Sequence, residues 1–344
     1  MSANPPTGEP APSDGVLPRE ALRGLGTRPF GVYVHVPFCA SRCGYCDFNT
    51  YTPGELGSSA SPASWLDAMR RELDLAARVL GEPPPADTVF VGGGTPSLLG
   101  ADGLAAVLDA IRSSLGLARD AEVTTEANPE STSAAFFDGL FAAGYTRVSL
   151  GMQSVAMHVL RVLDRTHTPG RALAAAAEAR AAGLAHLNLD LIYGTPGERE
   201  QDLLASLRAV VDAGVDHVSA YSLIVEDGTA LARRVRGGEL PMPDDDVLAD
   251  RYELIDEVLS GNGFSWYEVS NWAAPRPRPA AGTISGTGAA ATGGVPVPAR
   301  TVTSAACAGG TSSTPRGTRR CSARAGPLPP AGRCCRRVSG RSSG

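Results

Sequence analysis

Three cysteines with short, regular spacing are the residues of this chain best suited to chemistry. Cys39, Cys43 and Cys46 form a CxxxCxxC pattern directly after an apolar run, so three thiolates can face one point. A structural zinc site is the alternative, but zinc usually takes four ligands in paired spacings, and no fourth Cys or His lies nearby. A disulfide is disfavoured in a reducing compartment. The spacing therefore favours a 4Fe-4S cluster with one iron left for a substrate or cofactor.

A glycine triplet follows the next apolar run, in the segment Gly92-Gly93-Gly94-Thr95-Pro96. Glycine has no side chain, so backbone groups at such a segment can approach a ligand closely. A tight turn between a strand and a helix is the alternative interpretation. The triplet becomes a candidate ligand loop if the fold places it opposite the cysteines.

Polar residues also mark the ends of three later apolar runs. Glu126 and Asp190 supply carboxylates, which accept hydrogen bonds from a ribose or an ammonium group. Gln153 and the nearby Arg165 suit a carboxylate and adenosine hydroxyls. The alternatives are a helix-capping role for Glu126 and ordinary surface polarity for Gln153 and Arg165. Polar groups after five consecutive runs favour one shared site.

The elements that must position these residues alternate short apolar runs with longer Ala/Leu-rich amphipathic stretches. This pattern predicts an α/β fold with repeated β-α units and a parallel sheet. Six strands are predicted over residues 31–36, 88–91, 122–127, 147–150, 186–191 and 217–221. Six helices are predicted over residues 62–80, 101–115, 132–143, 169–183, 199–213 and 243–261. In such a barrel the C-terminal ends of the strands converge, so the polar residues should meet at one mouth.

Charge is distributed unevenly along the 344 residues, whose net charge is −5. All 31 basic residues are Arg; residues 274–344 hold 11 of them and no acid, which leaves 20 Arg against 36 acids, or −16, in residues 1–273. An acidic body argues against nucleic acid as a partner. No apolar run approaches the roughly 20 residues that span a bilayer, and no secretory signal is visible. These features predict a cytoplasmic protein with at most peripheral membrane contact.

The motifs together resemble the radical S-adenosylmethionine (SAM) superfamily, and within it the family that includes oxygen-independent coproporphyrinogen III dehydrogenase and the heme chaperone HemW. The resemblance covers residues 30–273. It implies a partial (β/α)6 TIM-type barrel in which Cys39, Cys43 and Cys46 bind a 4Fe-4S cluster. Tyr33 has an alternative interpretation as a core aromatic. The resemblance implies S-adenosylmethionine contacts from Tyr33, Gly93, Gly94, Thr95, Glu126, Gln153, Arg165 and Asp190.

Two segments separate the branches of that family. The dehydrogenase pattern has a Cys two residues after the third cluster ligand, where this chain has Phe48. The segment Cys-Asp-Phe-Asn-Thr-Tyr and residues 267–273 are similar to the heme chaperones instead. The resemblance thus implies heme as cargo, acceptor hemoproteins and an electron donor, with porphyrinogen decarboxylation in porphyrin biosynthesis as the alternative. His167 is the best placed of five histidines for heme iron, but no heme ligand is assigned.

The chain changes character after Ala273. Residues 274–344 contain no Phe, Trp or Tyr and are rich in Gly, Ser, Thr and Pro, which predicts a disordered tail. If the codons for residues 282–303 are read in the frame that begins at the third base of each codon, they can encode the sequence HNLGYWRGGDWWGAGPGAHSH. This sequence resembles the family's C-terminal region. We therefore expect a frameshift between codons 273 and 281. The tail cysteines are then accidents of translation, and a zinc-binding or redox tail is the alternative.

The expected organisation has three parts. Residues 1–28 form a disordered segment, residues 29–273 form the barrel, and residues 274–344 form a low-complexity tail in place of the family's C-terminal domain. Without that domain, apolar surface near Trp266 and Trp272 is expected to be exposed.

Overall fold

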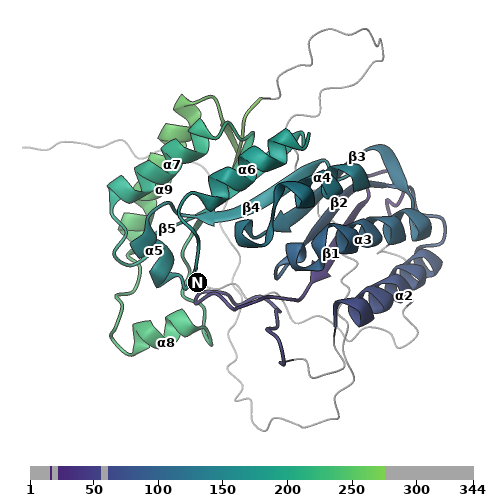
Figure 1. Cartoon of the computed structure of the whole chain (residues 1–344), viewed down its shortest axis with the longest axis horizontal. Coiled ribbons are helices and arrows are strands. Elements are labelled where there is room, and N and C mark those ends of the chain that lie inside the picture. Colours follow the sequence, from purple (N-terminus) through teal and green to yellow (C-terminus); the bar gives the residue numbers. More distant parts are fainter. Residues whose placement is uncertain (1–15, 18–21, 56–60, 276–344) are drawn as a thin grey trace, which may run out of the picture. The chain divides into compact units, whose positions relative to one another are not determined.

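The computed structural model describes residues 16–17, 22–55 and 61–275 (Figure 1). The predicted N-terminal segment and tail lie largely outside these described residues. The elements are β1 (Gly31–Val36), α2 (Pro62–Leu80), β2 (Ala86–Gly93), η1 (Pro96–Leu99), α3 (Gly100–Ser114), β3 (Leu117–Ala127), η2 (Pro129–Ser131), α4 (Ala134–Ala143), β4 (Arg147–Gln153), α5 (Met157–Val162), α6 (Arg171–Ala181), β5 (His186–Tyr193), α7 (Glu200–Asp212), β6 (His217–Ser222), α8 (Ala230–Arg236), α9 (Asp245–Gly261), β7 (Ser265–Glu268) and β8 (Asn271–Ala273).

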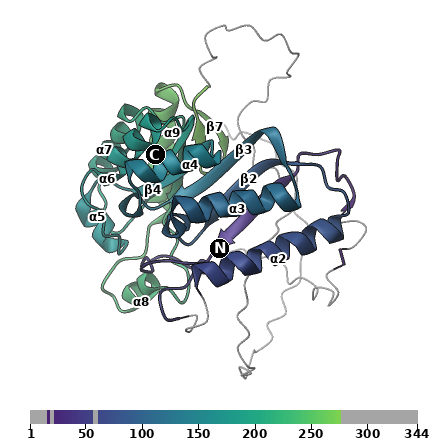
Figure 2. The same ribbon diagram turned by 45° about the vertical axis from the view of Figure 1, so that its right-hand side comes forward.

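The sheet has the order β1-β2-β3-β4-β5-β6-β8-β7. Strands β1 to β6 pair in parallel, and β8 and β7 extend the sheet beyond β6 as antiparallel strands. Helices α2, α3 and α4 lie side by side over one face of the curled sheet, and α6 continues this layer (Figures 1 and 2). The predicted partial barrel of six parallel β-α units is confirmed.

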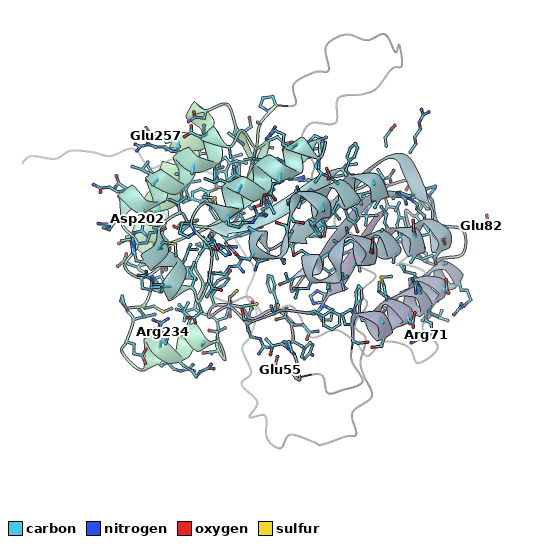
Figure 3. The ribbon with its side chains drawn as sticks, viewed as in Figure 1. Glu55, Arg71, Glu82, Asp202, Arg234 and Glu257 are labelled. Carbon is cyan, nitrogen blue, oxygen red and sulfur yellow. The ribbon has the colours of Figure 1, made fainter. Side chains whose placement is uncertain are left out.

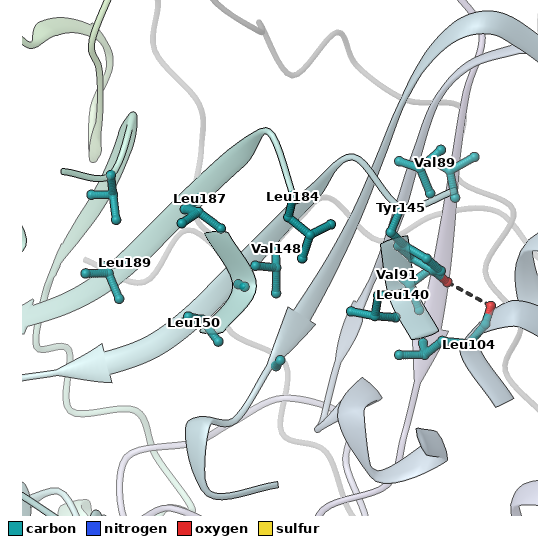
Figure 4. Close-up of a cluster of buried hydrophobic side chains, with 14 of the residues drawn as sticks. Val89, Val91, Leu104, Leu140, Tyr145, Val148, Leu150, Leu184, Leu187 and Leu189 are labelled. Atoms are coloured by element: carbon teal, nitrogen blue, oxygen red, sulfur yellow. Dashed lines mark hydrogen bonds between the residues drawn. The ribbon is translucent and has the colours of Figure 1, made fainter. Parts of the chain in front are cut away.

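Residues alternate between the two faces of each strand, and the helix-covered face holds the core. In β4 and β5 the side chains of Val148, Leu150, Leu187 and Leu189 are at most 1% exposed and pack in this layer (Figure 4). The Tyr145 hydroxyl donates to the Leu104 carbonyl at 2.9 Å, which satisfies its polar end within the core. We call this side of the sheet the helix face.

The opposite side, which we call the cavity face, carries the alternate residues. On β3, β4 and β5 these include Glu126, Ser149, Asn188 and Asp190, and on β6 they include His217. The side chains of the cavity face are polar, unlike those of the helix face, because no helix layer packs against them. By contrast, charged residues of the helix layer such as Arg71 and Glu257 point outwards (Figure 3).

Helix α2 illustrates how the sequence produces this layer. Its first turn follows Ser61, whose side chain accepts the Ser64 N–H in a capping box. Trp65, Met69 and Leu73 recur at the spacing of one helix face and are at most 2% exposed. Trp65 meets Phe38 of the loop after β1 edge to face, with ring centroids 6.2 Å apart. The helix therefore supports the loop that carries the cysteines.

Most differences from the predicted elements lie at their ends. The bounds of β1 and α2 agree with the prediction, whereas β2 to β6 each extend beyond it, by up to five residues at the start of β3. The pattern does not predict α5, α8, β7 or β8, because elements of three to seven residues hold too few periods to recognise. No helix among the described residues is long and apolar enough to cross a membrane.

The two tryptophans near the end of the described chain behave differently. Trp266 is 53% exposed, in line with the apolar surface expected in this region, whereas Trp272 itself is fully buried. The Trp272 Nε1 atom donates to Asp256 Oδ1 at 2.9 Å, and its ring lies against Tyr252 of α9. Pairing of β8 with β6 is what places Trp272 inside.

Candidate functional site

A cavity of about 940 Å³ lies at the C-terminal ends of the parallel strands. The predicted convergence is therefore observed. Tyr33 is not among its lining residues. Its side chain is half-buried on the cavity face of β1, where the hydroxyl contacts His35 Nδ1 at 3.0 Å and the ring stacks on Phe90, and it is not part of the hydrophobic core. The other predicted residues all line the cavity: Cys39, Cys43, Cys46, Gly93, Gly94, Thr95, Glu126, Gln153, Arg165 and Asp190.

The cysteine loop after β1 folds back on its own strand. The Tyr51 N–H donates to the Pro37 carbonyl at 2.8 Å, and the Cys39 N–H donates to the Tyr51 carbonyl at 3.0 Å. A Cβ atom at Gly94 would lie 2.5 Å from the Phe38 carbonyl oxygen and 3.0 Å from Cys39 Sγ. Only glycine allows this approach, so the triplet does more than form a tight turn.

The three thiols are free and share the cavity wall. Thr95 Oγ1 lies 3.8 Å from Cys39 Sγ, Arg165 Nη1 donates to Cys43 Sγ at 3.3 Å, and burial raises the pKa of the Cys46 thiol. Among the described residues, no three His, Cys, Asp or Glu side chains form a group that could hold a single metal ion. A 4Fe-4S cluster does not require such a group, because its cysteines bind different irons. Three free thiols on the lining of one cavity are the type of donor that such a cluster binds.

Glu126 joins the glycine triplet to the cavity. Its Oε2 atom accepts the Gly93 N–H at 2.9 Å, and Gly93 has a φ of +114°, which favours glycine. The helix-capping interpretation is wrong, because the Asn128 side chain caps η2 by accepting the Glu130 N–H. Burial and then the charge of Asp190 raise the pKa of Glu126 to about 8. This carboxyl is therefore mostly protonated at pH 7.

A bulge bends the end of β4 between Gly151 and Gln153. Gln153 is 7% exposed and has a φ of 65°, an uncommon conformation for a residue with a side chain. A Cβ atom at Gly151 would lie 2.7 Å from Arg165 Nη2 and 2.8 Å from Gln153 Nε2. Glycine thus makes room for both polar groups at the mouth, and neither is ordinary surface polarity.

Asp190 is held by neighbours on the cavity face. Ser149 Oγ donates to Asp190 Oδ2 at 3.0 Å, and Asn188 Nδ2 donates to Asp190 Oδ1 at 2.7 Å. Burial raises the pKa of Asp190, against the opposing effect of these hydrogen bonds. The sequence analysis missed Ser149 and Asn188. Their alternation with the leucines of β4 and β5 was the available signal.

The histidines fall into two groups. His35, His158, His186 and His217 each have a hydrogen-bonding partner. His167 lines the cavity, and its Nε2 atom has no partner among the described residues. Burial and the charge of Arg165 lower the pKa of His167 to about 4, so its ring is neutral at pH 7.

Exposed apolar side chains are among the residues that line the cavity, and we call them the apolar rim. Phe48, Ile224 and Val269 are 62%, 60% and 66% exposed, and Leu98 and Tyr221 join them on the cavity wall. The rim residues come from four separate segments of the chain, at Phe48, Leu98, Tyr221 to Ile224 and Val269. No sequence pattern links them, which is why the sequence analysis missed the rim.

Comparison with known proteins finds relatives of this chain. The model of the radical SAM superfamily matches residues 33–210. The heme chaperone HemW of Mycobacterium tuberculosis is 67% identical over 254 residues, which cover 74% of this chain and 65% of that protein. The heme chaperone HemW of Escherichia coli is 36% identical over 247 residues, which cover 72% and 63%. The chain thus spans less than two thirds of the length of the curated relatives it matches.

A solved structure is also similar. Coproporphyrinogen III oxidase (HemN) from Escherichia coli, a radical SAM enzyme, superposes with a TM-score of 0.65 at 25% sequence identity. The match covers 75% of this chain and 58% of that one. The match agrees with the fold described above.

Proposed function

This chain belongs to the radical SAM superfamily, and from that membership we propose that it binds a 4Fe-4S cluster and S-adenosylmethionine in the cavity and carries heme to acceptor hemoproteins. The observation that carries the first part is the convergence of three free thiols, two glycines of the triplet and two carboxyl groups on the lining of one cavity. The identity of 67% to a heme chaperone supports the second part.

Each group on the wall has a role in this proposal. Cys39, Cys43 and Cys46 would hold the cluster. The carboxyl groups of Glu126 and Asp190 suit the donors of an ammonium or a ribose, and Arg165 suits a carboxylate. When bound, the cluster and S-adenosylmethionine supply radical chemistry that side chains cannot. Glycines, Thr95 and Gln153 complete the wall around the ligand.

The apolar rim supports heme as the cargo. A porphyrin is a flat and largely apolar ring, and ligand sites for such molecules are lined mainly by apolar and aromatic side chains. Phe48, Ile224 and Val269 expose such side chains beside the cavity. Isolated exposed apolar residues are ordinary, but a group that lines one cavity marks an interaction site.

Anaerobic decarboxylation of coproporphyrinogen III is the second candidate function, and the similarity to HemN favours it. Against it, Phe48 stands where the dehydrogenase pattern has a Cys. A heme carrier binds heme with a defined Soret band and transfers it to an apo-cytochrome. A dehydrogenase decarboxylates coproporphyrinogen III and forms 5′-deoxyadenosine. The two assays on the cluster-loaded chain separate the candidates.

Replacing a rim residue tests where heme binds. Phe48→Ser should weaken heme binding roughly tenfold, as loss of one buried aromatic contact would. Phe141→Ser is the matched control, because Phe141 is 53% exposed on α4 and does not line the cavity. Equal heme affinity in the Phe48 variant and the native chain would refute the rim as the heme site.

Two further points complete the proposal. We place the chain in the cytoplasm, where cluster-binding thiols stay reduced, and we include an electron donor, which a reducible cluster requires. Sequencing the gene across the codons for residues 265–290 tests the predicted frameshift. An in-frame gene restores the full C-terminal region. A confirmed shift means a shortened product that retains the barrel and its cysteines.

A further inference from the structure

A continuous row of hydrogen bonds runs from the cavity wall to β7. Asp190 Oδ1 accepts from the Asn188 amide nitrogen at 2.7 Å. Asn188 Oδ1 lies 2.6 Å from His217 Nδ1. His217 Nε2 lies 2.6 Å from the Tyr267 hydroxyl. We call these three bonds the Asp190–Tyr267 relay.

Strand pairing assembles the relay. Asn188 pairs with Ser149 across β4 and β5 and with His217 across β5 and β6. Asp190 is two residues beyond Asn188, so both side chains project from the cavity face. The Tyr267 ring, from β7, meets the His217 ring edge-on with centroids 5.7 Å apart. The contacts beyond β5 join different strands, so they exist only in the folded sheet.

With Asp190 ionised, the relay permits one arrangement of protons. Asn188 must direct its NH₂ group towards Asp190, because a carboxylate oxygen only accepts hydrogen bonds. The Asn188 carbonyl oxygen then accepts the proton of His217 Nδ1. In the neutral ring His217 Nε2 becomes an acceptor, and the Tyr267 hydroxyl donates to it. Burial and the charge of Arg147 lower the pKa of His217 to about 3, which keeps the ring neutral.

We propose that His217 is a positioning residue that fixes Asn188, and through it Asp190, in the orientation that binds S-adenosylmethionine. This inference rests on the proposed function, which assigns Asp190 to that ligand. A reversed Asn188 amide would place its oxygen against Asp190 Oδ1, and the two acceptors would repel each other. His217 and Tyr267 oppose the reversal, because both would have to exchange donor and acceptor roles.

The chain offers a matched histidine for comparison. His186 lies two residues before Asn188 on the same face of β5. Its Nδ1 atom contacts Asp216 Oδ2 at 2.5 Å, and Asp216 also accepts the Leu187 N–H at 2.7 Å. This pair ties the start of β5 to the residue before β6, at the end of the strand away from the cavity.

Ligand affinity of the cluster-loaded full chain tests the proposal, measured by anaerobic calorimetry with S-adenosylmethionine. His217→Leu removes the donor to Asn188 and should weaken binding about tenfold, while His217→Asn keeps a donor near the Nδ1 position and should stay within about threefold. Tyr267→Phe should weaken binding about threefold. His186→Asn should bind as the native chain does. Iron content and circular dichroism show that each variant is loaded and folded.

A second measurement does not depend on ligand binding. In the ¹⁵N-histidine-labelled full chain, the resonance lost in His217→Asn should show a neutral ring protonated on Nδ1 at pH 7. A ring protonated on Nε2 alone overturns the relay, and this holds even if His217→Leu does not fold.

The variant Asp190→Asn distinguishes failure of the proposed ligand site from failure of the proposed positioning role of His217. If Asp190→Asn binds S-adenosylmethionine as the native chain does, the proposed ligand site is wrong. If Asp190→Asn weakens binding but folded His217→Leu does not, the ligand site stands and the positioning role of His217 is wrong. If both His217→Leu and His186→Asn weaken binding equally, the effect is general to the strand and also overturns the proposal.

Discussion

The two faces of one sheet differ in what holds them together. On the helix face of β4 and β5, Val148, Leu150 and Leu187 make apolar contacts that have no preferred direction. On the cavity face, the buried Ser149 and Asn188 make directed hydrogen bonds to each other and to Asp190. Because both faces are buried, burial alone does not distinguish them. Alternate residues of the same strands therefore stabilise the fold and line the proposed ligand site separately.

The strongest test of this separation is removal of a cluster ligand. Cys39→Ala should abolish cluster binding and with it S-adenosylmethionine binding, because two thiolates do not hold a 4Fe-4S cluster tightly. The unfolding midpoint of the cluster-free chain should change little. Iron and sulfide content and thermal unfolding measure the two effects. A full cluster in Cys39→Ala would refute the site.

Adjacent residues of β4 give a direct contrast between the faces. Leu150→Ala should lower the free energy of unfolding by about 2–5 kcal/mol, the usual cost of a truncated core leucine. Ser149→Ala should cost about 1 kcal/mol but weaken S-adenosylmethionine binding, because it removes hydrogen bonds to Asp190. Chemical denaturation and calorimetry separate these outcomes. The opposite ranking would contradict the assignment of the two faces.

A methyl group at Gly94 tests the close approach of two loops. Gly94→Ala should displace the cysteine loop at a cost of about 1–3 kcal/mol and lower cluster content, since its Cβ would meet the Phe38 carbonyl oxygen at 2.5 Å. Gly261→Ala is the control, because its Cβ would meet nothing within 4 Å. Normal cluster content in Gly94→Ala would show that the loops can separate without loss.

A further contrast concerns pH. The pKa of Glu126 is raised from 4.5 to about 8 in the folded chain, so the folded state holds an extra proton between these values. The stability from this proton is fully present below pH 4.5 and is lost as the pH rises through 8, with a slope of at most about 1.4 kcal/mol per pH unit. Glu126→Gln should remove this slope in denaturation curves, whereas Glu122→Gln on the same strand should keep it. An unchanged slope in Glu126→Gln would contradict the raised pKa.

Much of the helix face could be predicted from sequence. The apolar runs of β1, β4 and β5 and the spacing of Trp65, Met69 and Leu73 in α2 carry a periodic signal that depends only on local geometry. The cysteine spacing is also local. Accordingly, the order of the predicted strands and helices agrees with the structure, and ten of the eleven candidate residues line one cavity.

The sequence pattern does not predict three features of the structure. These are the bulge at Gln153, the close contact of Gly94 with the cysteine loop, and the apolar rim. Each depends on atoms from segments far apart in the chain. A left-handed backbone at Gln153 has no residue signature, because the residue is not glycine. Tyr33 stacks on Phe90 of the neighbouring strand and lies outside the cavity lining, and this contact between strands also depends on the tertiary structure.

The sequence by itself determined which residues alternate along the strands, where three thiols stand together, and that the chain is an α/β protein of parallel units. These properties follow from spacing along the backbone, which folding does not alter. Only the tertiary structure decided which side chains meet across strands, such as Asn188 with His217, and which carboxyl keeps its proton, as Glu126 does. Hydrogen bonding and desolvation depend on distances between atoms in space, and the closing of the sheet sets those distances.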